Sequence, residues 1–208
     1  MKLIRSLFAV AAVAASLTLS VHAAPPAPET GTVDVKTGQT AIKLDQVFTT
    51  ALTAGEIAVA KISPGKTVLP KGELRFPIAG GAIDLATLVS EVIHSGGVNF
   101  SKGDVSVSVV DLIVSIPGGE VTPGISAVVV VNGQSLGRVA LFDIEATLTA
   151  PLELPKNKKI VVKDVSVTLT EAGATALNEA FGFEVPVFTS ETVVGTATIS
   201  ATVEKNLL

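Results

Sequence analysis

Period-two alternation of β-branched and polar residues is the sequence feature that most constrains the fold. Val105, Val107 and Val109 are separated by single serines, and the apolar pattern resumes over 112–116 after an irregularity at Asp111. Successive side chains of a β-strand point to opposite faces, and β-branched residues pack well on a pleated surface. The alternation therefore predicts a strand with one buried face.

Similar short segments follow one another along the chain, separated by turn signals. The clearest pair, 126–131 and 134–142, meets at Asn132-Gly133, which suits a type I′ hairpin turn because both positions need a positive φ. About eleven regularly spaced strands indicate a sandwich or a barrel. We predict a mainly β fold, an antiparallel β-sandwich with two short helices. The other predicted strands are 31–35, 56–62, 74–78, 88–95, 98–101, 144–154, 160–169 and 193–203.

Two segments have helical spacing and begin after residues that can cap a helix. Asp45 precedes 46–53, in which two apolar residues four positions apart form one stripe. Thr170 precedes 171–181, and Gly182 follows the last residue of that segment. We expect both helices to cover the ends of a β core.

The first 23 residues have the pattern of a signal peptide. Lys2 and Arg5 precede an almost continuous apolar run over 7–21, which is followed by a small-x-small cleavage site. This run is shorter than the ~20 residues that a membrane span needs, so we expect no transmembrane segment in the mature chain. A secreted or extracytoplasmic protein is expected. Its predicted parts are a signal peptide, a leader and one β domain, over 1–23, 24–37 and 38–208.

The charge and cysteine content exclude further classes. The chain has 15 basic and 19 acidic residues, and cleavage after residue 23 would remove two of the basic ones. An acidic chain of this kind is not expected to bind nucleic acid through bulk charge. Because there is no cysteine, hydrophobic burial and not a disulfide framework must hold the exported fold together.

Residue types that carry chemistry are nearly absent after the predicted cleavage site. There is no Cys, Trp, Tyr or Met in that part of the chain, and His94 is its only histidine. Reaction chemistry and transition-metal binding draw mostly on Cys, His and carboxylates. We therefore expect a non-enzymatic secreted binding or surface-interaction domain of unknown ligand. A hydrolase ranks third, because no Gly-x-Ser-x-Gly motif frames a serine.

A family resemblance is visible in the order of several short motifs. The chain resembles secreted bacterial proteins, many of them actinobacterial, and more distantly the HtaA-type haem-binding surface domain. That resemblance implies a β-rich sandwich with two short helices. The motifs are LRFPIAGG (74–81), HSGGV (94–98), RVALFD (138–143), VTLT (167–170) and ALNEAFG (176–182).

The resemblance also implies a haem ligand that this chain lacks. HtaA-type domains use a tyrosine to ligate the haem iron, supported by a histidine that hydrogen-bonds it, and there is no tyrosine here. The alternative function is a haem or apolar small-molecule carrier that has lost this ligand. The candidate ligand-binding residues are His94, Phe100 and Phe142. Haem coordination by His94 ranks below a structural role, in which His94 ends a strand half-exposed and bonds to backbone or to Glu91.

The sequence also offers one weaker candidate, a metal site. Asp143 and Glu145 are two residues apart on a predicted strand, so both side chains share a face and could contribute to a calcium site. An ordinary solvated sheet face is the simpler explanation of the pair and ranks above a calcium site. We expect no catalytic residues, and the cofactor is left unassigned.

Overall fold

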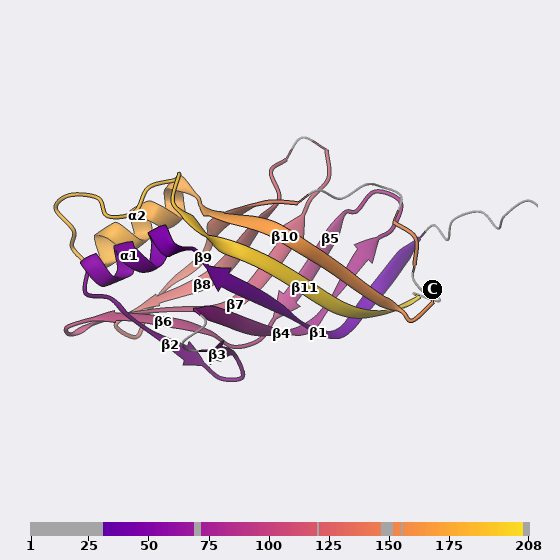
Figure 1. Cartoon of the computed structure of the whole chain (residues 1–208), viewed down its shortest axis with the longest axis horizontal. Helices are drawn as coiled ribbons and strands as arrows, with labels where there is room; N and C mark the ends of the chain where they lie inside the picture. Colours follow the sequence, from indigo (N-terminus) through magenta and orange to yellow (C-terminus); the bar gives the residue numbers. More distant parts are fainter. Residues whose placement is uncertain (1–30, 69–71, 120, 147–151, 155, 206–208) are drawn as a thin grey trace, which may run out of the picture.

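The computed structural model describes residues 31–68, 72–119, 121–146, 152–154 and 156–205. The described chain is mainly β, as predicted, with eleven antiparallel strands and two helices (Figure 1). The strands are β1 (Thr32–Leu44), β2 (Ala58–Ile62), β3 (Lys66–Val68), β4 (Glu73–Asp84), β5 (Ser90–His94), β6 (Gly97–Lys102), β7 (Val105–Ile116), β8 (Gly124–Val131), β9 (Gln134–Glu145), β10 (Lys159–Leu169) and β11 (Val193–Lys205). The helices are α1 (Gln46–Ala54) and α2 (Glu171–Ala180).

Eight of the strands close into a barrel. They pair in the order β7-β5-β4-β1-β11-β10-β9-β8, and β8 pairs with β7 to complete the circle. The predicted sandwich is therefore wrong. Inward and outward side chains alternate along a strand in both architectures, so the alternation does not reveal whether a sheet closes on itself.

The strands β5 and β6 lie one after the other along the same edge of β7. β5 pairs with residues 113–116 of β7, and β6 pairs with residues 105–110. The chain bends between them at Gly96, which has a φ of 79°. β2 adds to β6, and β3 adds to β4, so the sheet extends beyond the eight barrel strands on this side.

Several local predictions are confirmed. Asn132 and Gly133 both have positive φ, 49° and 83°, and connect β8 to β9 as a hairpin. Asp111 has a φ of 53° and marks a register shift within β7. Asp45 and Thr170 cap α1 and α2, because each side chain accepts a hydrogen bond from a backbone N–H in the first turn of its helix.

Some strand limits differ from the prediction. β1 runs 13 residues instead of ending at residue 35, so residues 32–37 of the predicted leader belong to the sheet. A register shift after Val35 and a glycine at 38 interrupt the alternation there, which hid the continuation. The three-residue strand β3 was not predicted. The predicted strand 144–154 is wrong at its start, because residues 144–145 are the last two residues of β9. Residues 147–151 of that predicted strand lie outside the described residues.

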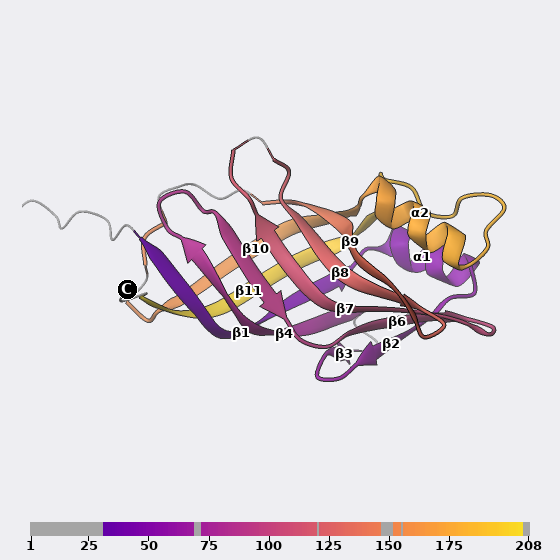
Figure 2. The same ribbon diagram turned by 180° about the vertical axis from the view of Figure 1, so that it is seen from behind.

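The helices cover one end of the barrel, while β1 begins and β11 ends at the other (Figures 1 and 2). Phe48 of α1 and Leu177 of α2 are buried against the strands. Phe48 also contacts Phe100 of β6 and Phe188, with ring centroids 6.5 and 5.9 Å apart. Aromatic packing therefore closes this end of the barrel, and less bulky aliphatic residues fill the remainder of the interior.

Candidate functional site

A cavity of about 60 Å³ lies inside the barrel, in the part away from the helices. Its walls come from seven barrel strands or their flanking turns and are aliphatic except for three polar side chains, Thr40, Ser90 and His94. Among the described residues, His94 is the one titratable side chain that lines the cavity. Leu88 and Leu152 also line the cavity, and both are half-buried.

The strand β5 places two of the polar groups in the cavity. Its residues alternate strictly, with Ser90, Val92 and His94 buried and Glu91 and Ile93 exposed. His94 pairs across the sheet with Ile78 of β4, and the bend at residue 96 follows. Ser90 and His94 therefore share the inward face.

His94 is bonded to a residue that the sequence did not single out. Its Nε2 lies 2.7 Å from the Oγ1 of Thr40 on β1, and both residues are only 3% exposed. Its Nδ1 is buried and has no hydrogen-bond partner within the described chain. The prediction that His94 ends a strand is confirmed, but a half-exposed ring is wrong, because His94 is only 3% exposed, and a bond to Glu91 is wrong, because Glu91 points outward.

Burial keeps the imidazole neutral. It lowers the pKa of His94 from 6.5 to about 4, and the backbone carbonyls of Leu112 and Val92 oppose this shift only in part. Neither carbonyl makes a well-formed hydrogen bond with Nδ1. At neutral pH, His94 is thus an uncharged ring with one engaged nitrogen and one unsatisfied nitrogen.

The turn between β4 and β5 holds Leu88 at the cavity in an unusual conformation. Leu88 has a φ of 66°, which is rare for a bulky residue. Its N–H donates to the Asp84 carbonyl at 2.8 Å, and the Asp84 carboxylate accepts from the N–H groups of Ala86 and Thr87. Strained residues of this kind are often found beside ligand sites. No sequence signal reveals the strain at Leu88.

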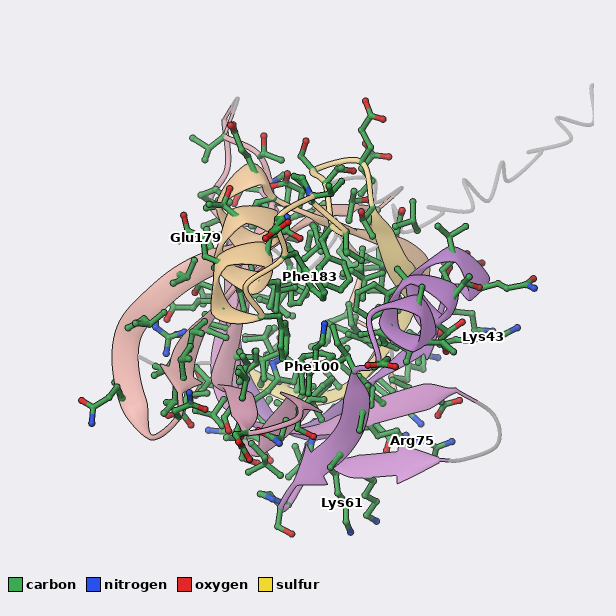
Figure 3. The ribbon with its side chains drawn as sticks, turned by 90° about the vertical axis from the view of Figure 1, so that its left-hand side faces the viewer. Lys43, Lys61, Arg75, Phe100, Glu179 and Phe183 are labelled. Atoms are coloured by element: carbon green, nitrogen blue, oxygen red, sulfur yellow. The ribbon has the colours of Figure 1, made fainter. Side chains whose placement is uncertain are left out.

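The two predicted phenylalanines are not beside His94. Phe100 and Phe142 line a second, smaller cavity of about 30 Å³ under the helices. Phe100 lies at the centre of the helix-covered end in Figure 3, near Phe183, whose ring carries the Lys102 ammonium 4.4 Å from its centroid. The candidate ligand-binding residues are thus divided between two separate cavities.

The carboxylate pair does not gather further ligands. Asp143 and Glu145 lie near the end of β9, on the opposite face from the buried Ile144. The described part of the chain contains no group of three or more His, Cys, Asp or Glu residues placed to hold a metal ion. A calcium site there stays a prediction.

No serine forms a nucleophile and base pair with His94. The Oγ of Ser95 lies 3.5 Å from the carbonyl oxygen of Pro77 and belongs to the bend after β5. Ser90 shares the inward face with His94, but the imidazole bonds to Thr40. Hydrolysis through a serine nucleophile activated by histidine needs such a pair within hydrogen-bond reach.

These features define a closed antiparallel barrel with two helices at one end and an apolar interior cavity. Solved structures with a similar fold come from Corynebacterium glutamicum. The C-terminal domain of HtaA matches with a TM-score of 0.61 and 16% identity, covering 83% of this chain and 99% of that domain. The N-terminal domain of HtaA gives a TM-score of 0.57 and 14% identity, covering 82% and 99%.

The haem-binding protein HtaB has the same fold, with a TM-score of 0.52 and 15% identity over 85% of this chain and 98% of HtaB. The fold resemblance to HtaA-type domains is therefore confirmed. No protein-family model and no curated protein matches the sequence significantly. Among the described residues, no helix has both the length and the apolar character needed to cross a membrane.

Haem does not fit the residues around His94. The cavity of about 60 Å³ is well below the ~300 Å³ at the lower end of ordinary small-molecule sites. The Nε2 of His94 is engaged by Thr40, and the chain has no tyrosine or cysteine to replace it as an iron ligand.

Proposed function

We propose that this protein is a non-enzymatic binding domain that takes an apolar small molecule into its barrel. The single observation that carries the proposal is the apolar cavity containing the buried, neutral His94–Thr40 pair. Thr40 lines the cavity, and its hydroxyl uses only one hydrogen-bonding site on His94, so a ligand or a water molecule could bond to the remaining ones.

The fold favours a carrier over a surface-interaction domain. The structurally similar HtaB is a haem-binding protein, and this shared fold supports a carrier role here. The present chain would take a smaller ligand, since its cavity is narrow and its iron ligands are missing. The predicted signal peptide supports an extracytoplasmic location.

Cavity-filling substitutions test the location of the ligand. Val162 lines the cavity, whereas its neighbour Val161 is 47% exposed on the other face of β10. We expect saturable binding of slender apolar compounds such as hexane to be lost in Val162→Phe and kept in Val161→Phe. Binding is measured by NMR titration of the full chain. Absence of saturable binding, or binding that Val162→Phe leaves unchanged, would contradict the proposal.

Haemin provides the second arm of this test. We expect no Soret shift that depends on His94, because the ring is enclosed and bonded to Thr40. A saturable Soret shift that His94→Ala abolishes, with the circular dichroism spectrum unchanged, would show that the barrel opens to admit haem and that His94 ligates it.

A further inference from the structure

The lining of the cavity determines the charge of its ligand. Of the described residues that line it, His94 alone is titratable, and burial holds it neutral. A charged ligand group would lie in the barrel without a counter-ion, and burial of an unpaired charge is far more costly than burial of a hydrogen-bonded neutral group. The ligand is therefore uncharged where it contacts the cavity.

The geometry of β5 determines its shape. Ser90 and His94 face inward with Val92 between them, and strand geometry separates residues four apart by about 13 Å. The cavity has a volume of only about 60 Å³, so it must be narrow if it extends over this length. A slender chain lying along β5, with Leu88 and Leu152 moving aside where it leaves the barrel, suits this shape better than a compact or planar molecule.

The polar groups determine which end of the ligand enters. The Nε2 of His94 and the Thr40 hydroxyl are bonded to each other at 2.7 Å, and this bond uses only one of the hydroxyl's hydrogen-bonding sites. A ligand hydroxyl has both a donor and acceptors, so it can bond to the Thr40 hydroxyl whichever tautomer the ring adopts. We propose that the cavity binds a slender, uncharged aliphatic molecule whose hydrogen-bonding end, a hydroxyl or similar neutral group, is held by the His94–Thr40 pair. This inference rests on the proposed function.

Three probes of equal chain length test it on the unmodified full chain: hexanol, hexane and hexanoate at pH 7. We expect hexanol to bind about tenfold more tightly than hexane, equivalent to one hydrogen bond of about 1.4 kcal/mol. We expect hexanoate to bind more weakly than hexanol. Hexanol, unlike hexane, is expected to shift the imidazole ¹⁵N resonances of His94, which are identified by their loss in His94→Gln.

Threonine substitutions on β1 supply the matched variants. Thr40→Val removes the hydroxyl at nearly constant volume, and Thr37→Val does the same at an exposed position of the same strand. We expect the hexanol preference to fall to about twofold or less in Thr40→Val and to persist in Thr37→Val.

The outcomes separate the two proposals. Equal binding of hexane and hexanol would overturn this inference and leave the apolar cavity site standing, with a bound water satisfying His94. Hexanoate binding more tightly than hexanol would also overturn it. Failure of all three probes to bind would overturn the proposed function itself. The comparison of probes needs no variant, so it stands even where Thr40→Val does not fold.

Discussion

At the scale of single residues, His94 shows how strongly burial changes a side chain's role. Its position at the end of a strand was evident from the sequence, but its ring is enclosed and bonded to Thr40 on another strand. Thr40 and His94 are far apart in the sequence, and β4 lies between their strands. Thr40 lies in the part of β1 that the sequence did not predict, so the pair was not expected.

The stability of the protein is expected to depend on pH through His94. The unfolded imidazole takes up a proton near pH 6.5, whereas the folded one does so only near pH 4. Between these values the unfolded state binds more protons, so acidification favours unfolding. The contribution of His94 is complete above pH 6.5, and about 3 kcal/mol of it is lost as the pH falls to 4.

Urea unfolding of the full chain and of His94→Gln from pH 7 to pH 4 measures this contribution. Carboxylates titrate in both proteins, so the difference between the two curves isolates His94. We expect the difference in the free energy of unfolding to change by about 3 kcal/mol across this range. Parallel curves would show that the imidazole is not buried in solution.

At the scale of elements, local signals predicted most of the structure. The Asn132-Gly133 hairpin, both helix caps and the irregularity at Asp111 are confirmed, since each depends on residues close together in sequence. The long strand β1 was missed because its alternation shifts register after Val35. A bulge changes which residues face inward, so a pattern of period two ends there although the strand continues.

Gly38 is expected to be essential for β1 to continue beyond the register shift after Val35. Gly38 has a φ of 151°, and a Cβ at this position would collide with the carbonyl oxygen of Ser200 on β11. We expect Gly38→Ala to lower the free energy of unfolding by more than about 2 kcal/mol, because rigid backbone would have to move.

Gly31→Ala is the matched control for this substitution. Gly31 also has a positive φ, 133°, but no neighbour lies within 4 Å of a Cβ built there. It isolates the cost of backbone conformation from that of collision. Equal losses in the two variants, measured by urea unfolding, would contradict the importance of close approach between β1 and β11.

At the scale of the whole molecule, stability comes from one continuous core inside a closed sheet. Its core contains residues from nine strands and both helices, with aliphatic side chains in the majority. The chain has no cysteine, and the described part shows no cluster of metal ligands. Hydrophobic burial therefore provides the main stabilisation.

EDTA is accordingly expected to leave the melting temperature of the full chain unchanged. Asp143 and Glu145 supply two carboxylates, whereas calcium sites usually gather six to eight oxygen ligands. Differential scanning calorimetry with EDTA, and then with excess calcium, checks this. A fall in melting temperature that calcium restores, and that Asp143→Asn prevents, would establish the carboxylate pair as a calcium site.

The sequence alone determined what depends on neighbouring residues: a mainly β chain, the positions of most strands, the main hairpin, two capped helices and a scarcity of groups for catalysis. Tertiary structure alone decided that the sheet closes into a barrel, that His94 meets Thr40, and that Phe100 and Phe142 line a different cavity. The physical reason is that alternation specifies which face of a strand is buried, while the identity of the paired strand depends on packing between distant segments. The cavity exists only where several such strands meet, so no local pattern could reveal it.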